Sequence, residues 1–351
     1  MSEPGSRPAA VAESSGFELP DRLAQLPGYP LADIPVIKAR LRAEGRSVID
    51  LGIGDTGLPV PAAAVEALCA GAGDPGMQGY AFQRGLPDFR AAVVDWMADR
   101  FGRRVDPDTE ILPVIGTKEG IAHLAFAVLD PGDSVLIPDP GYAPYFGGGY
   151  LAGARIHYSI LREANGFLIP PDEIMATPGR LRIVYLNYPN NPTGATCDRA
   201  YLEDVVAACR ARDAVLVWDN AYSEIAFDDY RPPGLLEVDG GMEQGIEFHS
   251  LSKSFSMTGW RLGWACGNAP LVAALARVKA FVDTGPYLPV QAAGAAALRS
   301  SAEYLPECVR TLRERRDAAV EAFWSAGFEV ASPRAGIYLW MPVPTSESSE
   351  S

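Results

Sequence analysis

The stretch HSLSKSFSMTGWRLGW, residues 249–264, combines an amine, several hydroxyls and a guanidinium within an otherwise apolar sequence. Lys253 follows Ser250 by three residues and precedes Arg261 by eight. Lysines are seldom placed where the surrounding chain is buried, unless they are paired. A lysine amine can form a Schiff base with an aldehyde, and an arginine can bind a phosphate with two parallel hydrogen bonds. The stretch therefore predicts a binding site for a ligand that carries both groups.

Further polar residues follow other apolar runs. Asp219 ends the run AVLVW, Tyr222 comes three residues later, and Asn191 lies in the turn NYPNNPTG. Thr117 and Lys118 open a helical pattern directly after Gly116, and the N-terminus of a helix binds phosphate well. Tyr142 follows the run SVLIPDP. A carboxylate such as Asp219 could keep a pyridine nitrogen protonated, although an aspartate at this place also commonly forms turns. An aldehyde, a phosphate and a pyridinium together describe pyridoxal 5′-phosphate (PLP).

Short apolar runs alternate with helical patterns along the chain, which predicts a mainly parallel α/β sheet covered on both faces. Ligands bind beyond the carboxyl ends of the strands in such sheets, which is where the polar residues fall. The predicted strands are 48–54, 110–116, 133–139, 182–189, 214–220, 245–252 and 328–344. The predicted helices are 33–45, 61–72, 86–102, 117–129, 199–213 and 304–327. Residues 249–264 are predicted to form a strand, a turn and a second strand.

Composition narrows the class of protein. With 351 residues, 48% of them hydrophobic, the chain can form one large domain and a smaller one. The net charge of −14 argues against nucleic acid or an anionic membrane as partner. Five scattered cysteines and three distant histidines predict reduced thiols in a cytoplasmic protein and no metal site. The N-terminal residues are not typical of a signal peptide, and no stretch reaches the length of a membrane span.

The motifs NNPTGA, DNAYSEI and SLSKSFSMTGWRLG, in this order, resemble the class I/II aminotransferases of PLP fold type I. The spacing of Ser250, Lys253 and Arg261 matches the S-x-x-K-x7-R arrangement of that family. The similarity extends from about residue 20 to the end of the chain. GIGDTGLP, GTKEGIAHL and PDPGYAPY add to it, and the branch that the chain resembles most closely is bacterial LL-diaminopimelate aminotransferase.

The resemblance implies a fold and a domain organisation. A large PLP-binding domain, residues 51–283, would hold a mainly parallel seven-stranded sheet between helices. Residues 21–50 and 284–351 would form a smaller α/β domain, and residues 1–20 a disordered leader. The resemblance also implies a cytoplasmic homodimer that transfers an amino group between an amino acid and a 2-oxo acid. LL-diaminopimelate and 2-oxoglutarate, in lysine biosynthesis, are the expected pair.

The same resemblance implies a role for each candidate residue. Lys253 would be the catalytic residue, bound to the cofactor through its amine, and Asp219 would pair with the pyridinium nitrogen. Tyr222 and Asn191 would contact the phenolic oxygen of the cofactor, and Tyr142 would stack on its ring. The residues expected to hold the phosphate are Thr117, Lys118 (through its backbone N–H), Ser250, Ser252, Arg261 and, from the neighbouring subunit, Tyr80. The residues expected to contact substrate are Tyr29, Gly54 and Asn191.

The C-terminus departs from the family pattern. The family carries a further arginine there that binds the substrate carboxylate, but no arginine follows Arg334 in this sequence. The sequence therefore predicts a small domain that is incomplete at its C-terminus, with Arg84 as the first alternative clamp for the carboxylate. Two other functions stay open from the residues alone. One is a PLP-binding protein with little or no turnover, and the other is a PLP-dependent β-lyase.

Overall fold

The computed structural model describes residues 20–24, 26–28, 33–52, 54–82 and 84–343. The chain divides into two compact units, residues 1–54 and 55–351. The predicted boundary at residue 283, between the large domain and the C-terminal part of the small domain, lies inside the second unit and stays a prediction. In the first unit the described helices are α1 (Asp21–Ala24) and α2 (Ile34–Ala43). Within the described part of the chain, no helix combines the length and the apolar character needed to cross a membrane.

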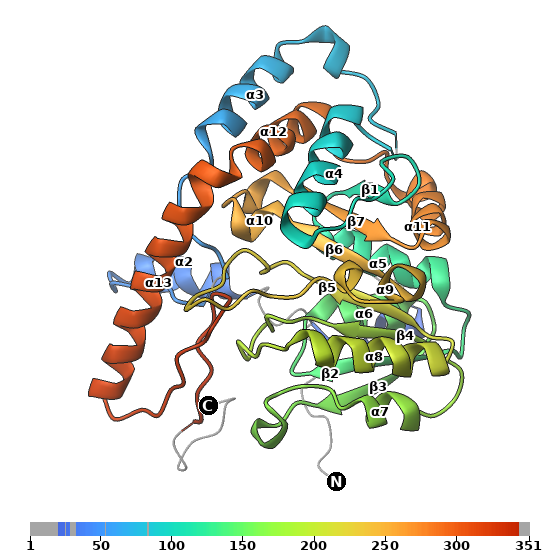
Figure 1. Cartoon of the computed structure of the whole chain (residues 1–351). Helices are drawn as coiled ribbons and strands as arrows, with labels where there is room; N and C mark the ends of the chain where they lie inside the picture. The colour runs from blue at the N-terminus through green and yellow to red at the C-terminus, as the bar shows by residue number, and fades with distance from the viewer. Residues whose placement is uncertain (1–19, 25, 29–32, 53, 83, 344–351) are drawn as a thin grey trace. The chain divides into compact units, whose positions relative to one another are not determined.

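A seven-stranded sheet lies at the centre of the second unit (Figure 1). Its order is β1-β7-β6-β5-β4-β2-β3, and β7 alone runs antiparallel to its neighbours. The prediction of a mainly parallel seven-stranded sheet is therefore confirmed. The strands are β1 (Ile111–Val114), β2 (Ser134–Asp139), β3 (Arg155–Ile160), β4 (Leu181–Leu186), β5 (Val215–Asp219), β6 (Gly245–Ser250) and β7 (Gly263–Gly267).

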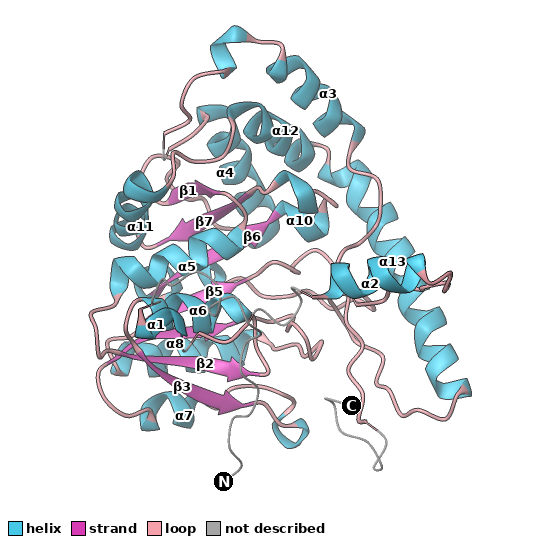
Figure 2. Ribbon diagram, turned by 180° about the vertical axis from the view of Figure 1, so that it is seen from behind, coloured by secondary structure: helices cyan, strands magenta, loops and turns pink. Residues whose placement is uncertain are grey.

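Helices cover both faces of this sheet (Figures 1 and 2). One face packs against α5 (Thr117–Val128), α6 (Ala143–Leu151) and α11 (Ala269–Val282). The other packs against α4 (Pro87–Phe101), α7 (Pro171–Ala176), α8 (Arg199–Ala211) and α12 (Leu288–Arg299). The remaining α-helices of this unit are α3 (Ala62–Ala72), α9 (Gly241–Gln244), α10 (Leu251–Ser254) and α13 (Ser301–Ser325).

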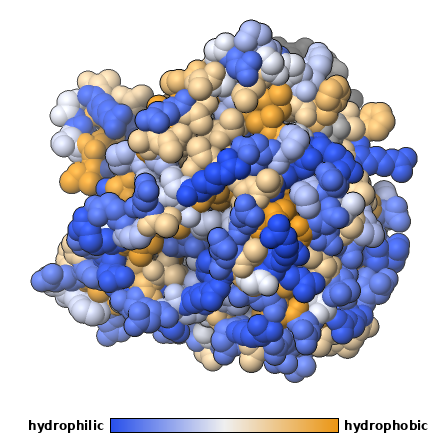
Figure 3. Space-filling view, turned by 45° about the horizontal axis from the view of Figure 1, so that its top comes forward, coloured by the Kyte–Doolittle hydropathy of each residue, from blue (hydrophilic) through white to orange (hydrophobic). Residues whose placement is uncertain are grey.

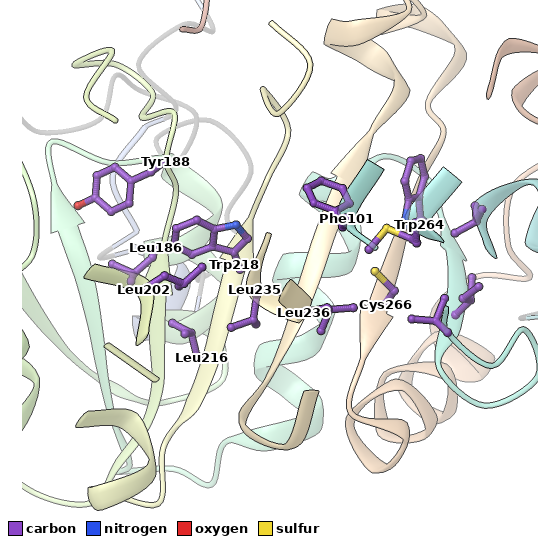
Figure 4. Packing of buried hydrophobic residues seen from close by; sticks show 14 of the residues in the cluster. Phe101, Leu186, Tyr188, Leu202, Leu216, Trp218, Leu235, Leu236, Trp264 and Cys266 are labelled. Atoms are coloured by element: carbon purple, nitrogen blue, oxygen red, sulfur yellow. The ribbon is translucent and has the colours of Figure 1, made fainter. Parts of the chain in front are cut away.

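The buried strands explain why the sheet forms. β4 and β5 are almost continuously apolar, as strands covered on both faces usually are. Figure 4 shows the packing of one face, where Leu216 and Trp218 of β5 lie among Leu186, Leu202 and Leu235. Local signals set the helix ends. Pro87 occupies the first turn of α4, and Gly102 ends it with a φ of 65°, a conformation that suits glycine.

Two predicted strands are wrong. In the described residues 48–52 and 54 there is no strand, and Ile49 and Leu51 are 86% and 85% exposed. Residues 328–343 form only an isolated bridge between Ala335 and Ala226. Gly336, with a φ of 83°, interrupts the extended backbone directly after that bridge. An apolar run becomes a strand only where it finds a neighbour to pair with, which sequence alone does not reveal. The six predicted helices and the other five predicted strands are confirmed, whereas α1, β3, α6, α7, α9, α10, α11 and α12 were not predicted. Residues 251–254, predicted as the end of a strand and the start of a turn, form the short helix α10, which Ser250 caps.

Candidate active site

Six strands, β1 to β6, run in the same direction and end at the same edge of the sheet, and candidate residues follow five of them. Asp219 is the last residue of β5, and its neighbour in β6, Phe248, stands two residues before Ser250. The register pairs Ser250 with Gly263 of β7 and Gly263 with Val114 of β1. Gly116 and the first turn of α5 are therefore level with the loop that carries Lys253. The strand order thus brings together residues that are separated by more than a hundred positions in the sequence.

Asp219 is deeply buried at this edge, with 3% of its surface exposed. Its Oδ2 accepts a hydrogen bond of 2.8 Å from the Tyr145 hydroxyl, whereas Oδ1 is buried and has no hydrogen-bond partner. Burial raises the pKa of the Asp219 carboxyl from 3.8 to about 6, although Tyr145 and the charges of His249 and Lys253 act in the opposite direction. A buried acceptor without a partner is costly, so Oδ1 indicates a place where a donor can bind.

Asn187 links Asp219 to Asn191. Its Nδ2 donates to the backbone carbonyl of Asp219 at 2.6 Å, and its Oδ1 accepts from the backbone N–H of Asn191 at 2.7 Å. Asn190 closes the following turn by accepting two hydrogen bonds from Thr193. The position of Asn191 is thus fixed to the end of β5. Sequence reasoning missed Asn187, because its role depends on a contact with a strand 32 residues away.

Lys253 lies half-buried in the short helix α10, which follows β6. Burial lowers the pKa of the Lys253 amine, and the positive charge of Arg261 adds to this, while Asp55 and Asp219 oppose it. A lowered pKa increases the fraction of neutral amine, which is the form that acts as nucleophile and base. Lys253 also lies near enough to Asp219 for the two charges to interact.

Arg261, Ser252 and Gly116 form a cradle beside this lysine. The Arg261 guanidinium donates to the Thr258 carbonyl at 2.7 Å and to the Ser252 hydroxyl at 3.4 Å. It also passes so close to Gly116 that a Cβ there would lie 2.2 Å from Nη2. Ser250 caps α10 by accepting from the backbone N–H of Ser252, and Thr117 is buried at the start of α5. Lys118 is the next residue of α5, and its side chain is exposed.

Tyrosines line the same edge. Burial, followed by the neighbouring Tyr338 and Asp219, raises the pKa of Tyr222 well above its usual value. The Tyr222 and Tyr338 hydroxyls are 2.9 Å apart. Tyr142 is half-buried at the start of α6, with its ring 5.7 Å from that of Tyr145. Sequence reasoning missed Tyr338 and Tyr145. The spacing of Tyr145 three residues after Tyr142, on one side of a helix, was a usable signal for the second.

Among the other candidate residues of the second unit that the structure describes, Tyr80 and Arg84 do not join this group in the single chain. Tyr80 is 75% exposed, and its ring is near only that of Phe82 among the described rings. Arg84 pairs with Asp108. Gly54 ends the first unit, and Tyr29 lies outside the described residues. The expected contacts of these four residues with phosphate or substrate stay predictions.

Comparison with known proteins agrees with this geometry. Residues 46–350 match the family model of class I and II aminotransferases. LL-diaminopimelate aminotransferase from Moorella thermoacetica is 45% identical over 334 residues, which cover 94% of this chain and 85% of the relative. Substrate-bound BacF from Bacillus subtilis superimposes with a TM-score of 0.88 at 29% identity, covering 95% of this chain and 84% of the other. A probable N-succinyldiaminopimelate aminotransferase from Thermus thermophilus superimposes with a TM-score of 0.83 at 35% identity, covering 90% and 84%.

Proposed function

The chain belongs to the class I and II aminotransferases, and from this premise we propose that it moves the amino group of LL-diaminopimelate to 2-oxoglutarate with PLP at Lys253. The observation that supports the site most directly is the buried Oδ1 of Asp219, which has no partner and lies at the same sheet edge as Lys253. The proposal places the reaction in lysine biosynthesis and the enzyme in the cytoplasm.

The residues present fit PLP at each of its polar groups. Asp219 Oδ1 offers an acceptor to the pyridinium N–H, and burial raises the pKa of this carboxyl, so a cationic partner would stabilise its ionised form. The cradle of Gly116 and Arg261 suits a phosphate, because Gly116 leaves room where a side chain would collide with the guanidinium. The hydroxyls of Thr117, Ser250 and Ser252 and the N–H groups at the start of α5 would complete the phosphate site. Tyr222 and Asn191 would donate to the phenolic oxygen, and Tyr142 would cover the ring.

When bound, PLP supplies an electron sink for the bonds at the substrate Cα. The chain supplies positioning and proton transfer. The neutral amine of Lys253 would accept the proton from the substrate Cα and hold it within the site. Asp219 would hold the ring nitrogen in its protonated form, and its low-dielectric surroundings strengthen that ion pair. Tyr142, Tyr222 and Tyr338 would limit access of water to the ring.

The first prediction concerns the substrate. We expect glutamate to form from 2-oxoglutarate in the presence of LL-diaminopimelate, at a kcat/KM at least about tenfold above that with aspartate, phenylalanine or N-succinyl-diaminopimelate. A difference of one charged hydrogen bond to the distal end of the substrate corresponds to roughly this factor or more. The assay measures glutamate release with each donor. A preference for another donor contradicts the substrate proposal. Release of ammonia and a keto acid without 2-oxoglutarate, from an amino acid that carries a leaving group on Cβ, indicates a β-lyase.

The second prediction concerns assembly. We propose a homodimer in which Tyr80 reaches the phosphate of the partner subunit. In the single chain Tyr80 and Phe82 are 75% and 64% exposed, and Phe281 is 90% exposed. Exposed apolar groups of this size often mark interfaces. Figure 3 shows one face of the molecule, on which hydrophobic residues are exposed between hydrophilic ones.

A mixing experiment tests this arrangement. Dimers of Tyr80→Ala should bind PLP weakly, and dimers of Lys253→Ala should be inactive. A mixed dimer, however, contains one site with both native residues, so mixing and reassociating the two variants should restore activity. Sedimentation should show a dimer throughout. A monomer that binds PLP tightly, or mixed chains that stay inactive while the native protein survives the same treatment, would contradict the proposal.

A further inference from the structure

Lys279 of α11 is a buried lysine that the proposed reaction does not use. Its side chain is fully buried, with 0% exposed. Its ammonium donates to Glu119 Oε1 at 2.7 Å and to the two oxygens of Asp283 at 3.0 and 2.9 Å. Lysines are almost never fully buried unless they are paired in this way. The two carboxylates thus account for the burial of this lysine. Each of them also accepts a hydrogen bond from the backbone of a neighbouring segment.

Glu119 holds the turn that leads into α5. Its Oε2 accepts the backbone N–H of Ile115 at 2.9 Å, and its Oε1 accepts from Lys279 and lies 2.7 Å from His123 Nδ1. Ile115 directly precedes Gly116, whose φ of 73° opens the cradle beside Arg261. A side chain in the first turn of a helix that bonds back to a preceding N–H fixes the entry of the chain into the helix. Glu119 therefore fixes the backbone that would present N–H groups to the phosphate.

Asp283 extends the same contacts to a second segment. Its Oδ1 accepts the backbone N–H of Gly285 at 2.7 Å. Gly285 has a φ of 87°, and a Cβ there would lie 2.6 Å from the Phe82 carbonyl oxygen. The turn after α11 thus packs against the loop that carries Tyr80. Lys279 is consequently connected through one carboxylate to the start of α5 and through the other to Ala81 and the backbone of Phe82, in the loop that carries Tyr80.

Charge gives Lys279 a second effect. Glu119 carries its negative charge in the first turn of α5, where a phosphate would also bind. Like charges at short range repel each other, and more strongly where burial limits screening by solvent. Burial opposes ionisation of Glu119, but the hydrogen bond with His123, then the charge and hydrogen bond of the Lys279 ammonium, and the Ile115 N–H together lower the pKa of this carboxyl, so it is ionised. Lys279 therefore neutralises a charge that would otherwise oppose phosphate binding.

We propose that Lys279 is a positioning residue for the phosphate group of the ligand, acting through Glu119 on the turn at Gly116. The inference rests on the proposed binding of PLP at Lys253. It predicts a specific loss: without Lys279, affinity falls for a ligand that carries the phosphate and not for the same ligand without it. A residue that merely stabilises the fold would affect both ligands alike.

The third prediction compares PLP with pyridoxal, which lacks the phosphate. We expect Lys279→Met to lower the affinity for PLP by about tenfold to a hundredfold, the usual effect of losing a hydrogen bond to a charged group. The affinity for pyridoxal should change by less than about threefold. Dissociation constants are measured by absorbance titration of the full chain after removal of bound cofactor. Arg100→Met is the matched control, because it breaks the buried ion pair with Glu224, and it should not separate the two ligands.

A double variant keeps the test decisive if Lys279→Met folds poorly. Glu119→Gln retains a carbonyl oxygen for the Ile115 N–H but removes the negative charge. Lys279→Met combined with Glu119→Gln should therefore bind PLP within about tenfold of the native chain, and more tightly than Lys279→Met where that variant folds. Equal losses for PLP and pyridoxal, or no loss for either, would overturn the inference. If the native chain does not bind PLP, the proposed function is overturned together with the inference about Lys279. If the native chain binds PLP and only the Lys279 result differs from the expected one, the inference alone is overturned.

Discussion

Replacing Asp219 by asparagine should lower turnover at least about a hundredfold. The same replacement should change the stability of the cofactor-free protein: compared with the native chain, the variant should gain free energy of unfolding as the pH rises from 4 to 8. The first effect follows from the proposed ion pair with the ring nitrogen. An asparagine has nearly the same shape but no charge, so the ring nitrogen loses its counterion. Removing one preorganised electrostatic contact to the reacting groups costs on the order of 10²–10³ in kcat.

The second effect follows from the raised pKa of Asp219. The carboxyl has a pKa of about 6 in the folded protein and an ordinary value of 3.8, so the folded state binds the proton more tightly than the unfolded state. The ionised carboxylate therefore destabilises the fold. This cost is fully present above pH 6 and disappears as the pH falls towards 3.8. The difference between the two pKa values corresponds to roughly 3 kcal/mol.

Denaturant unfolding of both proteins between pH 4 and pH 8 measures this effect. The free energy of unfolding of Asp219→Asn, minus that of the native chain, should rise by roughly 2–3 kcal/mol over this range. Any effect of the new amide group on the free energy of unfolding is the same at each pH, so it cancels when values at different pH are compared. Asp133→Asn is the control, because Asp133 is also a buried acid (5% exposed) but precedes β2, at the amino ends of the parallel strands.

Each part of this prediction can fail separately. Unchanged turnover in Asp219→Asn would show that the ring nitrogen does not depend on this carboxylate. A stability difference that does not vary with pH would show that burial does not raise the pKa of Asp219. Both results together would remove Asp219 from the proposed site.

The candidate residues that sequence patterns could find are those whose positions follow from strand ends. Asp219 and Ser250 are the last residues of their strands, and Asn191 lies in the turn five residues after the end of β4. Parallel strands bring their carboxyl ends to one edge of the sheet. Periodicity predicts such strands well where they are buried on both faces, because their apolar runs are continuous. The order of the strands is not needed for this conclusion.

The residues that sequence patterns missed are those whose role depends on tertiary contacts. Tyr145 donates to Asp219 across 74 positions, and Lys279 donates to Glu119 across 160. Nothing in the local sequence of α11 distinguishes Lys279 from an exposed lysine. The wrongly predicted strands at 48–54 and 328–344 have the same origin, since pairing depends on whether a free strand edge lies within reach. Local sequence sets the propensity of a segment to form a helix or a strand. Tertiary packing determines whether the segment forms that structure in the folded protein.

Lys253 provides the second large effect. Replacing Lys253 by alanine should lower turnover at least about a thousandfold, because the chain loses both its nucleophilic amine and its proton carrier at the substrate Cα. PLP should still bind, since the phosphate cradle and Asp219 are unchanged. Borohydride reduction and peptide mapping should label Lys253 in the native protein and no lysine in the variant. The chain has only three other lysines, Lys38, Lys118 and Lys279, so the assignment is unambiguous.

Two controls separate loss of the amine from loss of structure. Lys38→Ala breaks an ion pair with Asp50 in the first unit and should leave both turnover and labelling at Lys253 unchanged. A small primary amine added to Lys253→Ala should restore part of the turnover, because it can enter the space left by the side chain and carry the proton. Labelling at Lys118 or Lys279 in the native protein would contradict the role of Lys253. Rescue by the amine without labelling in the variant would instead show that the remaining residues of the site keep their positions when the lysine side chain is removed.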